Sequence, residues 1–191
     1  MTQVLDRIRN GVDSAQMFGT LDAIKENPAL GIFQFRAHNH WIDGAHNRST
    51  IKGFFGAGQE DTTRTAAFTL DAGEPQVLLG FDTGPNPAEY LLHALAACLT
   101  TTLVYVATAR KVMLSHVTST LTGDMDVRGA LGLSDEVRNG FSKIRVHFDL
   151  KGDASDEKLQ EIVERAQARS VVYDIVTNGV PASVRALSSS T

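Results

Sequence analysis

Residues 85–111 read PNPAEYLLHALAACLTTTLVYVATARK, and this stretch decides the fold. Asn86 suits a helix cap and Pro87 the first helical position, so the pattern predicts one helix from Pro87 to about Lys111. Its apolar side chains occupy most of the helix circumference instead of one stripe, and they are Leu91, Leu92, Leu95, Leu99, Leu103, Val104 and Val106. A chain of 191 residues has little material to cover such a helix alone, and small residues such as Ala97 let a second helix approach. The sequence therefore predicts an obligate homodimer whose long helices meet at its centre.

The segment before this helix predicts a short helical extension followed by antiparallel strands. Helical spacing after the candidate caps Asp13 and Ser14 places a helix within residues 1–30. Alternating side chains and the turn residues Asp43 and Gly44 then predict a hairpin that begins near Phe33 and returns to about Phe55. Further strands are expected at 64–70 and 76–81, and the glycine-rich run GFFGAG at 53–58 is interpreted as a mobile loop.

The segment after the long helix repeats the strand pattern and adds a second helix. Alternation predicts strands at 116–125 and 141–150, joined by a loop with one helical turn. Ser155 is the candidate cap of the second helix, and a last short strand is expected at 181–187. No repeat or linker divides the sequence, so residues 1–191 are predicted to form a single α+β domain with antiparallel sheets.

Composition narrows the classes of function. The formal net charge is −4 and there is no basic run, which argues against nucleic acid or a membrane surface as partner. The longest apolar run is interrupted by His93 and by threonines, and the first residues lack an apolar leader, so no membrane span is predicted and the expected compartment is the cytoplasm. Cys98 is the only cysteine, so the chain cannot form a disulfide with itself.

Two stretches resemble the motifs of a known family. Residues 84–103, GPNPAEYLLHALAACLTTTL, resemble the signature of the osmotically inducible protein C and organic hydroperoxide resistance family (OsmC/Ohr), and residues 169–181, RSVVYDIVTNGVP, are similar to its second motif. The resemblance covers about residues 31 to 187. It implies an intertwined homodimer with antiparallel sheets wrapped around long central helices, and it implies cysteine peroxidases that reduce organic hydroperoxides.

The resemblance also implies roles for particular residues. Cys98 matches the cysteine that attacks the peroxide, whereas the resolving cysteine falls at or next to Ser170, where no sulfur is present, so the chain is a divergent member without the second cysteine. The resemblance further implies an arginine beside the thiol: Arg48 is the nearest candidate, and Arg36 and Arg64 are alternatives. Residues expected to line a substrate pocket are Thr101, Thr102, Tyr105 and Ser170.

The acidic residue of those peroxidases has no clear counterpart. The resemblance places their glutamate at Ala88, one residue before Glu89. Nine residues separate Glu89 from Cys98, which puts the two side chains about half a turn apart on a straight helix. Cys98 also lies beyond the first turn, where the helix dipole acts, so a lowered thiol pKa is expected to require a nearby cation.

Purely structural explanations of these residues remain open beside the functional ones. A free cysteine in an apolar helix is often only a packed side chain, and threonine hydroxyls such as those of Thr101 and Thr102 often bond the helix's own carbonyls. The cluster of His38, His40 and His46 is compatible with a metal site but also with a solvent-exposed hairpin, and neither a metal nor a cofactor is predicted.

Three functions are compared on this basis. The leading hypothesis is thiol-dependent hydroperoxide reduction in oxidative-stress defence, with one cysteine and an external thiol reductant. The alternative is a non-catalytic dimeric module that binds a small apolar ligand on the same scaffold. A third interpretation is a metal-dependent activity built on the hairpin histidines.

Overall fold

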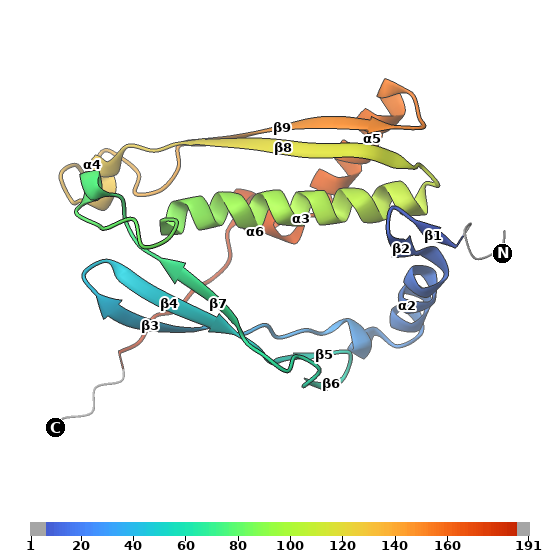
Figure 1. Cartoon of the computed structure of the whole chain (residues 1–191), viewed down its shortest axis with the longest axis horizontal. Coiled ribbons are helices and arrows are strands. Elements are labelled where there is room, and N and C mark those ends of the chain that lie inside the picture. The colour runs from blue at the N-terminus through green and yellow to red at the C-terminus, as the bar shows by residue number, and fades with distance from the viewer. Residues whose placement is uncertain (1–6, 187–191) are drawn as a thin grey trace. The chain divides into compact units, whose positions relative to one another are not determined.

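The computed structural model describes residues 7–186, which form two compact units divided after His93. Helices and antiparallel strands occur in both, so the predicted α+β class with antiparallel sheets is confirmed (Figure 1). Each unit is described by itself below. The single domain expected over residues 1–191 stays a prediction.

The first unit begins with a small hairpin and a helix. Strands β1 (Ile8–Arg9) and β2 (Val12–Asp13) pair before helix α2 (Ser14–Glu26), and the 3-10 helix η1 (Pro28–Gly31) follows. The side chain of Asp13 accepts a hydrogen bond from Gln16 N at 3.0 Å, which satisfies one free N–H of the first turn of α2. The helix predicted within residues 1–30 is therefore confirmed at 14–26.

A three-stranded sheet forms the centre of the first unit. Strands β3 (His38–Asp43), β4 (His46–Ile51) and β7 (Phe68–Ala72) pair antiparallel in the order β3-β4-β7 (Figure 1). Gly44 has a φ of 52° in the predicted turn, a left-handed conformation that glycine adopts without strain. The hairpin is confirmed, but its first strand begins at His38 and not near Phe33.

Two other expectations for the first unit were wrong. GFFGAG is not a loop: strands β5 (Phe54–Gly56) and β6 (Gln59–Asp61) form a second hairpin, and Gly58 turns the chain with a φ of 83°. Residues 76–81 form no strand, because the 3-10 helix η2 (Gln76–Leu78) occupies the segment and Leu79 ends it with a φ of 65°. Pro75 precedes this turn and favours it over an extended strand.

Helix α3 (Pro87–Ala109) begins in the first unit and continues into the second. Its start is a capping box: Glu89 N donates to Asn86 Oδ1 at 2.9 Å, and Asn86 N donates to Glu89 Oε2 at 2.9 Å. The predicted helix is thus confirmed within two residues at its end. Its length and hydropathy would suit a membrane span, with 28% of its apolar window buried, but the core helix of a soluble protein has the same properties.

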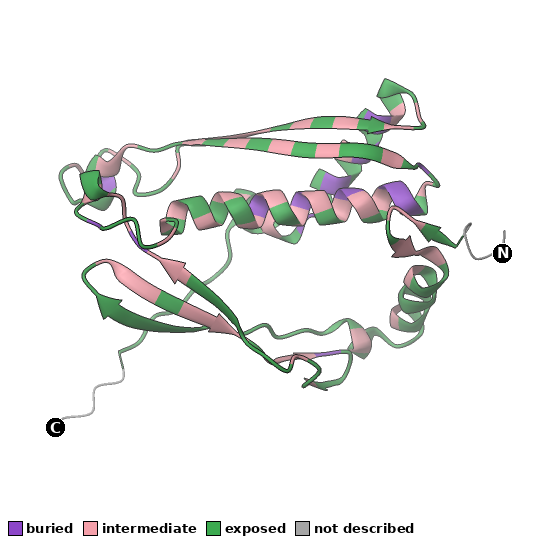
Figure 2. Ribbon diagram, viewed as in Figure 1, coloured by how far each residue is buried: buried purple, intermediate pink, exposed green. Residues whose placement is uncertain are grey.

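The second unit places α3 against a long hairpin and a further helix. Strands β8 (Leu114–Asp124) and β9 (Lys143–Gly152) pair antiparallel, with the short helix α4 (Val127–Ala130) in the connection, and α5 (Asp156–Gln167) follows. These elements confirm the strands and the helix predicted after the long helix. The buried core joins α3, the loop between α3 and β8, and α5 (Figure 2). Its residues are Leu103, Ala107, Val112, Leu159, Ile162 and Ala166.

The end of the second unit differs from the prediction. Ser170 begins helix α6 (Val171–Asn178), where no helix was expected. Residues 181–186 form no strand, so that expectation was wrong for the described part of 181–187; residue 187 lies outside the described residues. Gly179, with a φ of 70°, ends α6.

Candidate functional site

Cys98 lies on α3 between the buried residues Leu95 and Leu99. Cys98 itself is partly buried. The helix therefore holds this residue at the edge of the second unit's interior.

Ser170 is in direct contact with Cys98. Its Oγ donates a hydrogen bond to Cys98 Sγ at 3.2 Å, and its residue is 2% exposed. The same Oγ accepts from Tyr173 N at 3.2 Å and so caps α6. The second motif thus lies against the first, with a hydroxyl facing the sulfur.

Two backbone N–H groups at the start of α6 also favour the charged form of the sulfur. The backbone N–H groups of Val172 and Val171 both act on Cys98. They belong to the first turn of α6, where N–H groups have no partner inside the helix and carry the positive end of its dipole. The sulfur of one helix therefore lies at the N-terminus of another.

These contacts lower the pKa of the Cys98 thiol. Burial is the largest single influence and raises the pKa, because it disfavours the charged thiolate. The Ser170 hydroxyl and the N–H groups of Val172 and Val171 favour the thiolate and outweigh burial. No charged side chain of the described residues contributes to this lowering, so the predicted cation beside the thiol stays a prediction.

The predicted pocket residues divide into two pairs. Thr102 Oγ1 donates its one proton to Cys98 O at 2.8 Å, so the structural interpretation, a bond to the helix's own carbonyl, holds for this hydroxyl. Thr102 and Ser170 are therefore both in contact with Cys98. Thr101 and Tyr105 are exposed, Tyr105 by 50%, and no hydrogen bond joins either to Cys98 in the described part of the chain.

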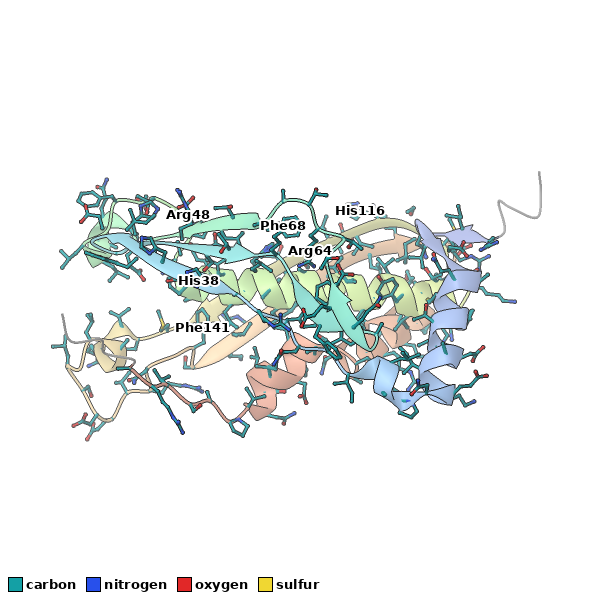
Figure 3. The ribbon with its side chains drawn as sticks, turned by 90° about the horizontal axis from the view of Figure 1, so that it is seen from below. His38, Arg48, Arg64, Phe68, His116 and Phe141 are labelled. Atoms are coloured by element: carbon teal, nitrogen blue, oxygen red, sulfur yellow. The ribbon has the colours of Figure 1, made fainter. Side chains whose placement is uncertain are left out.

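The three candidate arginines lie in the first unit, and each has a partner there. Arg48 Nε donates to Asp71 Oδ1 at 2.9 Å, and Arg36 binds Glu60 through both terminal nitrogens. Arg64 donates to the Lys52 carbonyl at 3.0 Å and lies 5.0 Å and 5.3 Å from the ring centres of Phe54 and Phe68, and Figure 3 shows it beside Phe68. Arg48 keeps its assigned role only as a prediction.

The histidine cluster does not form a metal site among residues 7–186. No three side chains of histidine, cysteine, aspartate or glutamate in this range lie close enough to hold a metal ion. His46 Nε2 instead lies 2.8 Å from Asp71 Oδ1, and His38 and His40 are exposed on β3. Asp71 on β7 thereby contacts both His46 and Arg48 on β4. Both contacts lower the pKa of the Asp71 carboxyl, and the contact with Arg48 contributes most.

A groove of about 530 Å³ lies beside β9 in the second unit. Its accessible lining is mainly polar, with His147, Asp149 and Asp156 beside apolar residues such as Leu159 and Val163. Cys98 is not among its lining residues. Any ligand bound in the groove would therefore occupy a site separate from the thiol.

The comparisons with known proteins agree with this architecture. The family model for OsmC-like protein matches residues 80–185, more than half of the chain, and this range contains both Cys98 and Ser170. No protein with a curated description matches the chain in sequence.

Solved structures share the fold at low identity. An OsmC-like protein from Mycoplasma pneumoniae is 14% identical, with 75% of this chain and 86% of that chain covered and a TM-score of 0.58. An organic hydroperoxide resistance protein OsmC from Legionella pneumophila is 19% identical, with 76% and 90% covered and a TM-score of 0.51. An OsmC-like protein from Vibrio cholerae is 13% identical, with 75% and 94% covered and a TM-score of 0.52.

Proposed function

Because the chain belongs to the OsmC-like protein family, we propose that it reduces organic hydroperoxides through Cys98 alone, with an external thiol as reductant. The observation that carries this proposal is the set of hydrogen bonds that favour the Cys98 thiolate, since the thiolate is the nucleophilic form. The relative from Legionella pneumophila is named an organic hydroperoxide resistance protein, which supports the substrate class.

The first chemical step consumes the hydroperoxide. The Cys98 thiolate attacks the terminal oxygen of the substrate, the O–O bond breaks, and the organic part leaves as an alcohol once its oxygen takes up a proton. Cys98 is thereby oxidised to a sulfenic acid. The donors around the sulfur, Ser170 Oγ and the first N–H groups of α6, stay in place to hold the anionic sulfenate.

Regeneration requires thiols from outside the chain. Cys98 is the only cysteine, and the hydroxyl of Ser170 cannot form a disulfide. One external thiol therefore condenses with the sulfenic acid, releasing water and forming a mixed disulfide, and a second thiol attacks that disulfide to free Cys98. The cytoplasm, which we propose as the compartment, supplies small reducing thiols.

Mass spectrometry tests this proposal directly. One equivalent of tert-butyl hydroperoxide is added in the presence of dimedone, which traps sulfenic acids, and the intact mass is measured. We expect one dimedone adduct on the wild-type chain, none on Cys98→Ser, and dithiothreitol consumption that depends on Cys98. A wild-type chain that gains no adduct and consumes no reductant would remove the peroxidase proposal.

The second candidate function is a module that binds a small apolar ligand. The missing second cysteine and the alanine at position 88 favour it, because both depart from the residues of the peroxidases. Binding of such a ligand would not need the thiol of Cys98. The two functions are distinguished by Cys98→Ser, which should bind an apolar fluorescent probe as tightly as the wild type if the ligand-binding function is the correct one.

We also propose that the functional unit is a homodimer. In the single chain α3 leaves Leu91 and Tyr105 exposed by 38% and 50%, although the helix is apolar around most of its circumference. A second copy that covers this surface would bury it at the centre of the dimer. Sedimentation should show a dimer at micromolar protein concentration, and a folded monomer there would refute the proposal.

A further inference from the structure

The hydroxyl of Ser170 has one donor and one acceptor around it. Tyr173 N donates to Ser170 Oγ, and this oxygen in turn donates to Cys98 Sγ, both at 3.2 Å. A hydroxyl has one proton to give and two lone pairs to receive. Because Tyr173 N–H occupies a lone pair, the single proton of Ser170 is directed at the sulfur.

Burial makes this arrangement stiff. Ser170 is 2% exposed, so solvent competes little for its proton, and its backbone is held by hydrogen bonds from Ser170 N to Gln167 O and from Asp174 N to Ser170 O. A thiol is a weak donor and acceptor, but a thiolate accepts strong, charge-assisted hydrogen bonds. The buried hydroxyl therefore gains most when Cys98 is ionised.

We infer that Ser170 is a positioning residue of the Cys98 site: its one oxygen caps α6 and donates to Cys98, which ties the start of α6 to the sulfur and prepares it as a thiolate. The cap and the donor are the same atom, Ser170 Oγ. Ser170 thus has a function of its own at the position where the family resemblance implies a second sulfur. Its importance for turnover rests on the proposed peroxidase function, whereas its effect on the thiol does not.

The pH dependence of Cys98 alkylation tests this inference without any peroxide. Iodoacetamide is added to the full chain, wild type and Ser170→Ala, across a range of pH, and the rate is followed by intact mass. Loss of one hydrogen bond to a charged group reduces the thiolate population at neutral pH by about tenfold. Each remaining thiolate is about threefold more nucleophilic, because nucleophilicity rises with pKa, so the net rate at neutral pH falls by about three- to fivefold.

The same substitution should have the opposite effect at high pH. There Cys98 is fully ionised in both proteins, so the rate of Ser170→Ala should exceed that of the wild type by about threefold. A merely structural role would not produce a curve that is lower at neutral pH and higher on its plateau. Ser170→Gly is the second variant, because glycine is tolerated as a cap and has no hydroxyl, and it should give the same curve.

Two controls separate the donor from the cap. Ser155→Ala removes the serine cap of α5, where Lys158 N donates to Ser155 Oγ at 3.4 Å, and should keep the wild-type curve. Ser170→Thr keeps the hydroxyl and should restore the wild-type curve. The inference is overturned if Ser170→Ala or Ser170→Gly titrates like the wild type, or if Ser170→Thr shifts as far as they do.

Failure of the inference is distinguishable from failure of the proposed function. A wild-type chain without a dimedone adduct, in which the Ser170 variants still shift the alkylation curve, refutes the peroxidase and leaves the positioning role intact. If the wild-type chain forms the adduct but the Ser170 variants titrate like the wild type, the positioning role is refuted and the peroxidase proposal stands.

Discussion

Each of the two units is stabilised internally in a different way. Among residues 7–93 the buried positions are three glycines, Gly56, Gly73 and Gly80, and large apolar side chains such as Phe35 and Phe81 are exposed by 71% and 77%. The second unit buries leucines, an isoleucine and alanines from α3 and α5 in one core. The second unit is thus fixed by its own packing, whereas the first relies on strand pairing and ion pairs and needs a further surface to cover its apolar side chains.

The second unit's reliance on its core predicts the largest effect. Leu103 is fully buried, and Leu103→Ala should lower the free energy of unfolding by about 2 to 5 kcal/mol, because it leaves a cavity. Leu133→Ala is the matched control, since Leu133 is 70% exposed, and it should change the value by less than about 0.5 kcal/mol. Denaturant unfolding measures both, and equal effects would mean that the core is not where the stability lies.

A disulfide inside the second unit should increase the difference in stability between the two units. Ser170→Cys places a thiol where an oxygen now lies 3.2 Å from Cys98 Sγ, and peroxide should convert the pair to a disulfide that closes a loop of 72 residues. The loop-closure argument gives a stabilisation of about 4 kcal/mol at most. Intact mass should show the loss of two hydrogens on oxidation, and two persistent free thiols would contradict the contact between the motifs.

A substitution on the surface of α3 tests whether a second copy of the chain covers the apolar side chains that a single chain leaves exposed. Ala97 is exposed, so Ala97→Phe would cost little in a monomer. Between two helices of a dimer the larger side chain should overpack and cost about 1 to 3 kcal/mol. Sedimentation and unfolding should both show the loss, while Ala23→Phe on the exposed face of α2 serves as control; an unchanged dimer would refute helix contact at Ala97.

Glycines should matter most in the first unit. A Cβ on Gly80 would lie 1.8 Å from the Glu74 carbonyl oxygen, so Gly80→Ala forces the backbone to move and should cost about 1 to 3 kcal/mol. Gly19→Ala, in α2 with open space around it, should instead stabilise by about 0.5 to 1 kcal/mol. Thermal unfolding separates the two signs, and a neutral Gly80→Ala would show that this loop yields easily.

The sequence predicted the long elements well, for physical reasons. Helix α3, helix α5 and the β8–β9 hairpin are long enough for their periodicity to stand out against chance. Short segments were predicted less well. The spacing of Val77, Leu79 and Phe81 is that of one face of a strand, yet the backbone turns at Leu79. Helix α6 has eight residues, several of them β-branched, so its pattern favoured no helix.

Helix α6, which was not predicted, also contributes to the candidate site. The motif resemblance placed Cys98 and Ser170 at the positions of the two cysteines of the peroxidases, and the structure shows the two residues in contact. The helix start at Ser170 was not predicted, because the capping glutamate or glutamine expected at position 173 is a tyrosine. The contributions of the Ser170 hydroxyl and of the first N–H groups of α6 to the lowered pKa of Cys98 were therefore not predicted, and the role of an arginine stays a prediction.

The most direct test is the pH midpoint of Cys98 alkylation in the folded wild-type chain, with the same chain in urea as reference. The hydrogen bonds from Ser170 and α6 predict a folded midpoint below that of the unfolded thiol, which is about 8.5. By linkage, the stability that Cys98 adds is then complete above the unfolded pKa and is lost as the pH falls through the folded pKa. A folded midpoint at or above the unfolded one would mean that burial dominates and that Cys98 is only a packed side chain.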